Sequence, residues 1–443
     1  MDQQLLDILR ADNPWLDGST LSGYALPTHL LARSVAAPFR TRVAEVDRAH
    51  LVIGPRQVGK STLIRKTLFD QNVTSLYLDC EQRSVRALCE SAPLFLDVIR
   101  NLVPPGTPLY FDEIQHLDEA ALFLKGLVDR KPGAPVIATG SSSYHLRSAT
   151  RESLAGRATR TRVLPFALQE VIADLSDPPL LIRRALSDER LDRMLRYGGY
   201  PRAWLDARPE VVLAELVDAF VLRDASDLYR VARPDAFRRL MVLVAGQAGS
   251  LVNLSEWAST LGISRDTVAS YLQILEDSHV CHTLRPFAGG KRVEHTSRPK
   301  VFLVDVGLRN RLVGDFRPFI ERVDRGAVAE QWVFSELLKG LPDDATLHFW
   351  RSAGNAEVDF VVVRGDHVVG VEVKASALER PALTRSARSF IDAYSPGEFW
   401  VVHRSGAMTT EVCGRTVVRH VPMVDLLSDS TALESALAPI RCP

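Results

Sequence analysis

The stretch that decides the fold is LVIGPRQVGKSTLIRKTL, residues 51–68, in which an apolar strand-like run enters a glycine-bounded loop and an apparent helix follows. It contains the pattern G-x-x-x-x-G-K-[ST] in its strand–loop–helix context, which is typical of a phosphate-binding loop (P-loop). Glycines let the backbone curl so that its N–H groups point at phosphate oxygens, and the helix N-terminus adds partial positive charge. We expect Lys60 to reach the β- and γ-phosphates of a nucleotide and the Ser61 hydroxyl to bind Mg²⁺. The expected nucleotide contacts are Gly54, Pro55, Arg56, Gln57, Val58, Gly59, Lys60, Ser61 and Thr62.

Two later strands should complete this site. PLYFDEIQHL (108–117) is an apolar strand ending in Asp112 and Glu113, and acids at the C-terminal end of a parallel strand lie where such sheets bind ligands. We expect Asp112 to hold Mg²⁺ through water and Glu113 to act as general base on the attacking water; a helix-capping pair is the alternative. APVIATGSSS (134–143) ends in small polar residues, of which Ser141 and Ser142 could meet the γ-phosphate, or form a plain turn.

Composition describes an ordinary globular protein of 443 residues, with 46% hydrophobic and 24% charged residues, long enough for about three domains. The net charge is zero, so any nucleic-acid contact must come from a local basic patch. The five cysteines form no C-x-x-C pair, which argues against disulfides and a zinc site. No signal peptide or long apolar run is present, so we expect a cytoplasmic protein without membrane contact. Only eight lysines accompany forty-six arginines, so lysine is a rare choice in this chain.

The motifs GPRQVGKST, LYFDEIQHL, TGSSS and ESLAGR together resemble the AAA-type ATPases of bacteria and archaea that carry a C-terminal domain of unknown function. The resemblance implies an AAA-type sheet in which the 134–143 strand lies between the P-loop strand and the acidic strand. It also implies an arginine on the γ-phosphate, for which Arg157 and Arg160 are the matching positions; a surface or structural role is the alternative.

Residues 166–232 read as helices interrupted by YGGYPRAWL (197–205). This turn is similar to the G-x-P element with which the lid of related ATPases touches the nucleotide, so Gly199 and Pro201 are candidate contacts. A helix-breaking turn is the alternative.

Residues 251–287 predict a helix-turn-helix, and VCHTLRPF with 299–305 supplies two wing strands. DNA binding would use Arg265 and Thr267, aided by Lys291 and Arg292 in the wing. Residues 251–300 hold six basic and five acidic side chains, however, which favours a protein-contact or spacer winged helix.

The last third carries a second chemical signature in AEVDFVVVRGDHVVGVEVKAS (356–376), which reads as two strands joined by a two-residue loop at Gly365 and Asp366. This loop places Arg364 opposite His367 and therefore Asp359 opposite Glu372, with Lys374 on the same face. Facing carboxylates repel, and a divalent cation is the simplest compensation.

Lys374 could then orient or deprotonate a water, which arginine could not do because it keeps its proton. Together with Glu330 on a preceding helix, the pattern D-x₁₂-E-x-K resembles the PD-(D/E)xK nuclease superfamily, although Val358 stands where the superfamily has proline. The resemblance implies metal ligands at Glu330, Asp359 and Glu372. A solvated hairpin, or a nuclease-like fold kept as an inert binding module, is the alternative.

We therefore predict an α/β protein with four parts: an AAA-type ATPase core (1–165), a helical lid (166–232), a winged helix (233–320) and a PD-(D/E)xK nuclease-like domain (321–443). The expected cofactors are ATP and Mg²⁺. The leading hypothesis couples ATP hydrolysis to action on DNA or RNA. The alternative is a nucleotide-dependent switch that binds a protein partner through an inactive nuclease-like scaffold. The sequence is compatible with an oligomer and leaves the oligomeric state open.

Overall fold

The computed structural model describes residues 3–18, 26–140, 154–175, 179–221, 231–287, 298–352, 354–377, 383–428 and 432–438. The chain divides into two compact units. Unit 1 comprises residues 1–164 with 277–279, and unit 2 comprises residues 165–276 with 280–443.

Unit 1 is built on a parallel sheet of five strands in the order β2-β3-β4-β1-β5. The strands are β1 (Ala49–Ile53), β2 (Leu76–Asp79), β3 (Leu109–Asp112), β4 (Val136–Gly140) and β5 (Ala158–Arg162). Strands β3 and β4 are buried throughout, which is why they read as continuous apolar runs. Strand β4 lies between the P-loop strand β1 and the acidic strand β3, so this expectation from the resemblance is confirmed.

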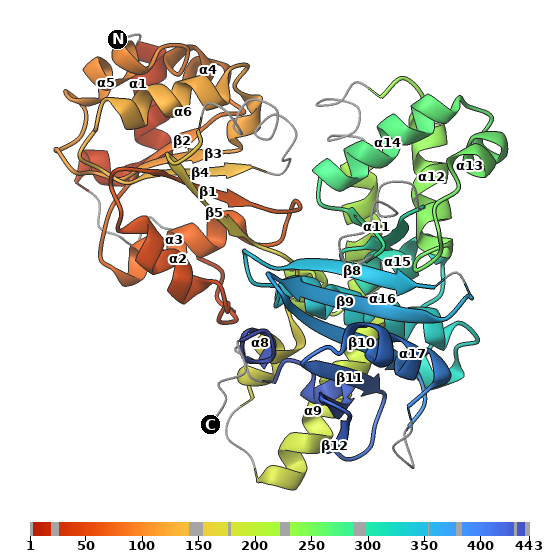
Figure 1. Cartoon of the computed structure of the whole chain (residues 1–443). Helices are drawn as coiled ribbons and strands as arrows, with labels where there is room; N and C mark the ends of the chain where they lie inside the picture. The colour runs from red at the N-terminus through yellow and green to blue at the C-terminus, as the bar shows by residue number, and fades with distance from the viewer. Residues whose placement is uncertain are drawn as a thin grey trace. The chain divides into compact units, whose positions relative to one another are not determined.

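Helices cover both faces of this sheet, with α2 and α3 on one side and α1, α4, α5 and α6 on the other (Figure 1). They are α1 (Gln3–Asp12), α2 (Ala36–Val43), α3 (Lys60–Asp70), α4 (Arg83–Leu88), α5 (Ala92–Ile99) and α6 (Ala120–Asp129), with 3-10 turns η1 (Pro14–Asp17) and η3 (Ile114–His116). Phe95, Phe111 and Phe123 form an aromatic cluster between sheet and helices, with ring centroids 5.4 to 5.5 Å apart. This packing fixes β3, which ends in Asp112.

Unit 2 begins with helices and a short hairpin. The helices are α8 (Leu168–Ala173), α9 (Leu180–Tyr197), α10 (Pro201–Leu205), α11 (Pro209–Ala219), α12 (Pro234–Gly246), α13 (Leu254–Leu261), α14 (Arg265–Asp277) and α15 (Val306–Val313). Between α14 and α15 lies the antiparallel pair β6 (Cys281–Leu284) and β7 (Lys300–Leu303). The two helices and two strands expected after Leu251 are therefore present, with the α13–α14 turn made by Gly262 at φ 65°.

The rest of unit 2 surrounds a six-stranded mixed sheet of order β12-β13-β11-β10-β9-β8. The strands are β8 (Thr346–Arg351), β9 (Glu357–Arg364), β10 (His367–Lys374), β11 (Glu398–His403), β12 (Thr409–Cys413) and β13 (Thr416–Pro422). The remaining elements are η6 (Phe319–Glu321), α16 (Arg325–Lys339), α17 (Arg385–Tyr394), η7 (Met423–Asp425) and α18 (Ala432–Ala436). Strands β8, β9 and β10 form an antiparallel meander, and α17 leads from β10 to the parallel strand β11.

Two helices secure this sheet through aromatic contacts. Phe334 of α16 stacks on Phe302 of β7 at 4.6 Å, and Phe302 lies 5.5 Å from Phe360 of β9. Phe390 of α17 packs on Trp350 of β8 at 5.3 Å. Strand β9, which carries Asp359, is thus held by α16 and by the β6–β7 hairpin.

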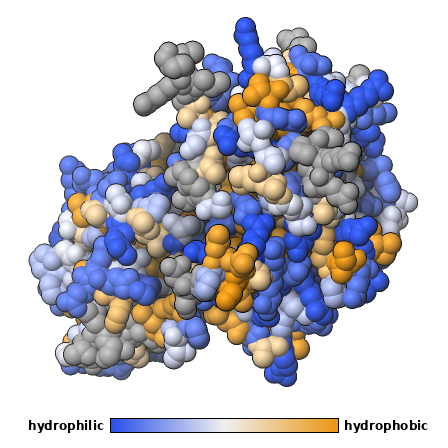
Figure 2. All heavy atoms as spheres, turned by 90° about the horizontal axis from the view of Figure 1, so that it is seen from below, coloured by the Kyte–Doolittle hydropathy of each residue, from blue (hydrophilic) through white to orange (hydrophobic). Residues whose placement is uncertain are grey.

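The surface carries no continuous apolar face in the view of Figure 2, where hydrophilic side chains predominate and apolar ones form separate patches. Among the described residues of unit 2, Leu180, Leu181 and Val323 are more than four-fifths exposed. Within the described ranges, no helix combines the length and the apolar character needed to cross a membrane.

Candidate functional site

The P-loop occupies residues 54–59, between the end of β1 and the start of α3 at Lys60. Its curl uses positive φ angles at Gly54 (152°), Gln57 (60°) and Gly59 (91°). A Cβ atom on Gly54 would lie 1.9 Å from the carbonyl oxygen of Val163, so only glycine fits there. The loop therefore has the backbone shape that turns N–H groups toward a phosphate.

The Lys60 side chain folds back over the P-loop and hydrogen-bonds to its backbone. It is 5% exposed, and its Nζ donates hydrogen bonds of 2.9 Å to the carbonyl oxygens of Gly54 and Pro55. The ammonium is thus already held over the loop, and phosphate oxygens are the stronger acceptors that could take over these hydrogen bonds.

Asp112, the last residue of β3, accepts hydrogen bonds from three hydroxyl groups. Ser61 Oγ lies 3.0 Å from Oδ1, Tyr77 Oη lies 3.1 Å from Oδ2, and Thr139 Oγ1 also donates to Oδ1. Burial, and then the charge of Asp112, raise the pKa of Tyr77 well above its usual value, so the phenol stays protonated as a donor. The Ser61 hydroxyl and the Asp112 carboxylate form the oxygen donor set that Mg²⁺ prefers, so these residues fit the ion.

Glu113 follows in a left-handed backbone conformation, with φ 52°, which is unusual for a residue other than glycine. Its N–H donates to Thr139 Oγ1 at 2.9 Å, and Gln115 Nε2 donates to its carboxylate. Burial acts to raise the pKa of Glu113, but the charge of Lys60 and the Gln115 hydrogen bond outweigh it, so the pKa lies below its usual value. Glu113 is therefore an ionised carboxylate beside the P-loop lysine.

Thr139 is a functional residue that the sequence reasoning missed. Its hydroxyl joins Asp112 to the backbone of Glu113, and it is fully buried. The β3–β4 register pairs Phe111 with Ala138, so Thr139 is the next partner along, beside Asp112. A register drawn between the two predicted strands could have found it. The expected contacts Ser141 and Ser142 lie outside the described residues.

The strand order, the P-loop and the acidic pair at the carboxyl edge of the sheet give unit 1 the fold of an AAA-type P-loop ATPase domain. Residues 46–172 match the family model described as an AAA domain. Residues 188–318 and 325–422 match two further models, each described as a domain of unknown function (DUF8612 and DUF4143).

Relatives span most of the chain. An uncharacterised protein of Mycobacterium tuberculosis is 28% identical over 393 residues, covering 85% of this chain and 82% of the relative. An uncharacterised protein of Haemophilus influenzae is 25% identical, covering 78% of this chain and 86% of the relative.

Similar solved structures include a Walker-type ATPase of Pyrococcus abyssi, at 16% identity and a TM-score of 0.43, covering 64% of this chain and 96% of that one. Another is the RuvB Holliday junction branch migration motor of Thermotoga maritima, at 15% identity and a TM-score of 0.32, covering 64% and 98%. Neither likeness is close enough to transfer a property.

The two candidate arginines lie on β5 or just before it. The Arg157 carbonyl accepts from Ala49 N–H, at the start of β1, and its Nε pairs with Asp129 at 2.6 Å. Because the P-loop follows the other end of β1, about 13 Å away at ~3.3 Å per residue, Arg157 lies too far from the P-loop of its own chain to contact bound nucleotide. Arg160 is exposed on β5 opposite Leu51. The γ-phosphate contacts expected of Arg157 and Arg160 stay predictions.

The GGYP turn has a packing role within unit 2. Gly199 N–H donates to the buried Asp305 carboxylate at 2.8 Å, and a Cβ on Gly199 would lie 2.3 Å from the carbonyl oxygen of Phe166. Pro201 begins α10. These packing contacts are enough to explain why a glycine is needed at position 199. The nucleotide contact predicted for Gly199 and Pro201 stays a prediction.

The start of α14 shows a local capping arrangement. Ser264 Oγ accepts from Thr267 N–H at 3.0 Å and lies 2.8 Å from the Thr267 hydroxyl. Thr267 is thus engaged within its own turn rather than extended for base contact, while the predicted wing residues Lys291 and Arg292 lie outside the described residues.

The predicted hairpin register is confirmed, because Arg364 pairs with His367 and the ladder continues to Phe360 and Val371. The ladder ends at that pair, one step before Asp359 and Glu372, so the facing of these two carboxylates stays a prediction. Beyond this point Val373 N–H donates to the Asp359 side chain, at Oδ2 and a distance of 2.7 Å, in place of a backbone carbonyl. Burial and then the neighbouring Glu330 raise the pKa of Asp359 to about 7.

The compensation for these carboxylates differs from the one expected. Lys374 Nζ lies 2.5 Å from Glu372 Oε1, and Thr384 Oγ1 donates to Oε2 at 2.8 Å. Glu330, which neighbours Asp359, is paired with Lys300 at 3.2 Å. Among the described residues, no three His, Cys, Asp or Glu side chains are grouped so as to hold a metal ion. The predicted divalent cation at Glu330, Asp359 and Glu372 therefore does not fit this arrangement, in which lysines and a backbone N–H supply the compensation.

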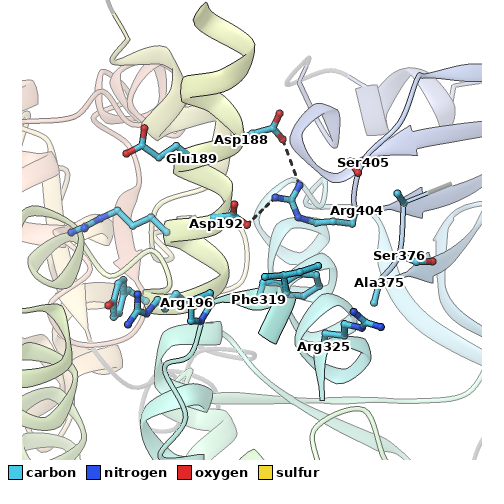
Figure 3. Close-up of a pocket in the computed structure, with 15 residues that line it drawn as sticks. Asp188, Glu189, Asp192, Arg196, Phe319, Arg325, Ala375, Ser376, Arg404 and Ser405 are labelled. Carbon is cyan, nitrogen blue, oxygen red and sulfur yellow. Dashed lines mark hydrogen bonds and ion pairs between the residues drawn. The ribbon is translucent and has the colours of Figure 1, made fainter. Parts of the chain in front are cut away.

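A separate pocket of about 810 Å³ in unit 2 lies between α9, residues 318–325 and the ends of β10 and β11. Figure 3 shows Arg404 reaching from the end of β11 to Asp188 and Asp192 on α9, at 3.5 and 2.8 Å. Arg196 and Arg325 also line the pocket. Its mixture of arginines and acids selects neither anions nor cations, and the Arg404 pairs join the sheet to α9.

Proposed function

We propose that this protein binds ATP with Mg²⁺ and hydrolyses it at the P-loop of unit 1. The observation that carries the proposal is the Asp112 carboxylate, which accepts hydrogen bonds from Ser61, Tyr77 and Thr139 beside the buried Lys60. This arrangement places an anion, a cation and curled backbone N–H groups at the edge of the sheet where parallel α/β proteins bind ligands.

Each residue then has one task. The loop N–H groups and Lys60 would bind the phosphates, while the Ser61 hydroxyl and, through water, Asp112 would hold Mg²⁺, which would supply positive charge to the phosphate groups. Glu113 orients the attacking water and polarises it, because an ionised carboxylate accepts a hydrogen bond from water. Thr139 holds the Glu113 backbone in place.

The test compares two lysines of the same helix. Lys60→Ala should abolish ATP binding and turnover, because it removes the phosphate-binding ammonium. Lys66→Ala is the matched control, since Lys66 lies on the same helix and pairs with Asp70 at 2.5 Å on the surface. ATP affinity and turnover that stay unchanged in Lys60→Ala would refute the ATPase proposal.

For unit 2 we propose the switch rather than the nuclease. In this proposal α12 to α14 with β6 and β7 act as a winged-helix spacer, and the sheet from β8 to β13 is a nuclease-like scaffold for a protein partner. The ion pairs of Glu330 and Glu372 with lysines support it, since they engage two of the three expected metal ligands. The test is a nuclease assay with Mg²⁺ or Mn²⁺, with and without ATP, on single- and double-stranded DNA and RNA. Cleavage that Lys374→Ala abolishes would contradict the scaffold and restore the nuclease.

A further inference from the structure

Lys300 is a buried lysine that no motif of the sequence singles out. It is the first residue of β7 and is 4% exposed, in a chain with eight lysines. Its Nζ lies 2.5 Å from Glu357 Oε1 and 3.2 Å from Glu330 Oε1, and 5.4 Å from the ring centre of Phe349. One ammonium thus joins three elements, α16, β8 and β9, from the β6–β7 hairpin.

The charge balance explains why a lysine is tolerated there. Burial lowers the pKa of Lys300, but Glu330 and Glu357 outweigh this effect and raise it, so the group is charged. An unpaired buried carboxylate is costly, and removal of one partner from a buried ion pair leaves the other uncompensated. Lys300 therefore supplies the positive charge beside Glu330, and it shares Glu357 with Arg351, whose Nε lies 3.9 Å from Glu357 Oε2.

The backbone fixes the ammonium in this position. Lys300 pairs with Leu284 in the β6–β7 ladder, and with Leu251 through an isolated bridge. A Cβ on Gly249 would come within 3.1 Å of Glu330 Oε2, so the segment before Leu251 closes over the carboxylate. The lysine is anchored by strand pairing on both sides rather than by a flexible loop.

We propose that Lys300 is an internal cation that takes the place of a divalent metal ion between Glu330 and Glu357 and so excludes it. A metal bound by these carboxylates would need oxygens at about 2.0 to 2.6 Å, within the same space that the ammonium fills. Two cations so close would also repel strongly in a buried site. This inference deepens the proposed scaffold role of unit 2 and is independent of ATP hydrolysis.

The experiment measures Mn²⁺ binding to the full-length protein without nucleotide, by the loss of the free-Mn²⁺ electron paramagnetic resonance signal. Wild type should show no Glu330-dependent binding at millimolar Mn²⁺, whereas Lys300→Ala should gain one site. Glu330→Gln in the Lys300→Ala background should remove that site, which assigns it to the cluster rather than to the P-loop. Lys300→Met keeps the apolar stem without the charge and serves as the second variant if Lys300→Ala does not fold.

Lys339→Ala is the matched control, because Lys339 is also a buried lysine of unit 2, paired with Glu336 at 2.7 Å. It should lose stability without gaining Mn²⁺. Two results would overturn the inference. One is Glu330-dependent Mn²⁺ binding by the wild type. The other is a folded Lys300→Ala or Lys300→Met variant that binds no more Mn²⁺ than the wild type. A nuclease assay reports separately on the scaffold proposal, so failure of one can be told from failure of the other.

Discussion

Glu113→Gln tests the chemistry of the P-loop site at a single atom. The substitution keeps the shape of the side chain, and its amide oxygen can still accept from Gln115 Nε2. What it removes is the negative charge that orients and polarises water. Loss of such a group costs about 10²- to 10⁴-fold in rate, or roughly 3 to 5.5 kcal/mol of barrier. We therefore expect kcat to fall by at least a hundredfold.

The affinity of Glu113→Gln for ATP should not fall with its turnover. Glu113 lies close enough to Lys60 for the lysine charge to lower its pKa, so its carboxylate also lies close to the expected phosphates. Removal of this negative charge relieves repulsion, and Glu113→Gln should bind ATP with Mg²⁺ as tightly as wild type or more tightly. Steady-state turnover and equilibrium titration with a fluorescent ATP analogue measure the two effects separately.

The pH dependence follows from the same contacts. Because the pKa of Glu113 lies below its usual 4.5, the base is ionised at neutral pH, and kcat/KM should fall only as the pH drops through that lowered pKa. In the ATP complex the phosphates bind Lys60, and their negative charge disfavours the ionised form of Glu113. The pKa of Glu113 should therefore be higher in the complex, and the acid limb of kcat should lie at higher pH than that of kcat/KM. A decrease in kcat of less than tenfold in Glu113→Gln would refute the assigned role.

Two further substitutions test separate contacts. Thr139→Val keeps the volume but leaves the buried Glu113 N–H without its acceptor, at a cost of about 1 to 3 kcal/mol, so both Tm and turnover should fall; Thr107→Val, which loses only an exposed bond to Pro104, is the control, and equal effects of the two would contradict the argument. Asp359→Asn should be neutral or stabilising at pH 8. An acid whose pKa rises from 3.8 to about 7 on folding loses stability as the pH increases between those values, and asparagine avoids this loss. Thermal unfolding of wild type and Asp359→Asn at pH 5 and pH 8 checks this prediction. If the Tm of the variant falls further below that of the wild type at pH 8 than at pH 5, the Asp359 charge is favourable and the prediction is wrong.

The ATPase site could be predicted largely from the sequence because its parts are local patterns. A P-loop is a contiguous run whose glycines, lysine and serine have fixed spacing, and Asp112 and Glu113 directly follow an apolar strand. The β9–β10 register was also predictable, since a two-residue loop with glycine at a positive φ of 57° allows one alignment of the strands.

The partners of those residues could not be read from the same patterns. Thr139 and Tyr77 reach Asp112 only because β4 and β2 flank β3 in the sheet, and Arg157 is separated from the P-loop by the length of β1. These relations depend on strand order and register between segments far apart in the chain.

The carboxylates of unit 2 show the difference most clearly. The sequence alone predicted that Asp359 and Glu372 face each other on adjacent strands and need compensation, because side chains alternate with a period of two along a hairpin. Only the tertiary structure decided that Lys300 reaches Glu330 and Glu357, since this lysine comes from β7, on a hairpin that precedes α16. A single ammonium is placed by the packing of three elements, and no spacing within any one of them encodes that position.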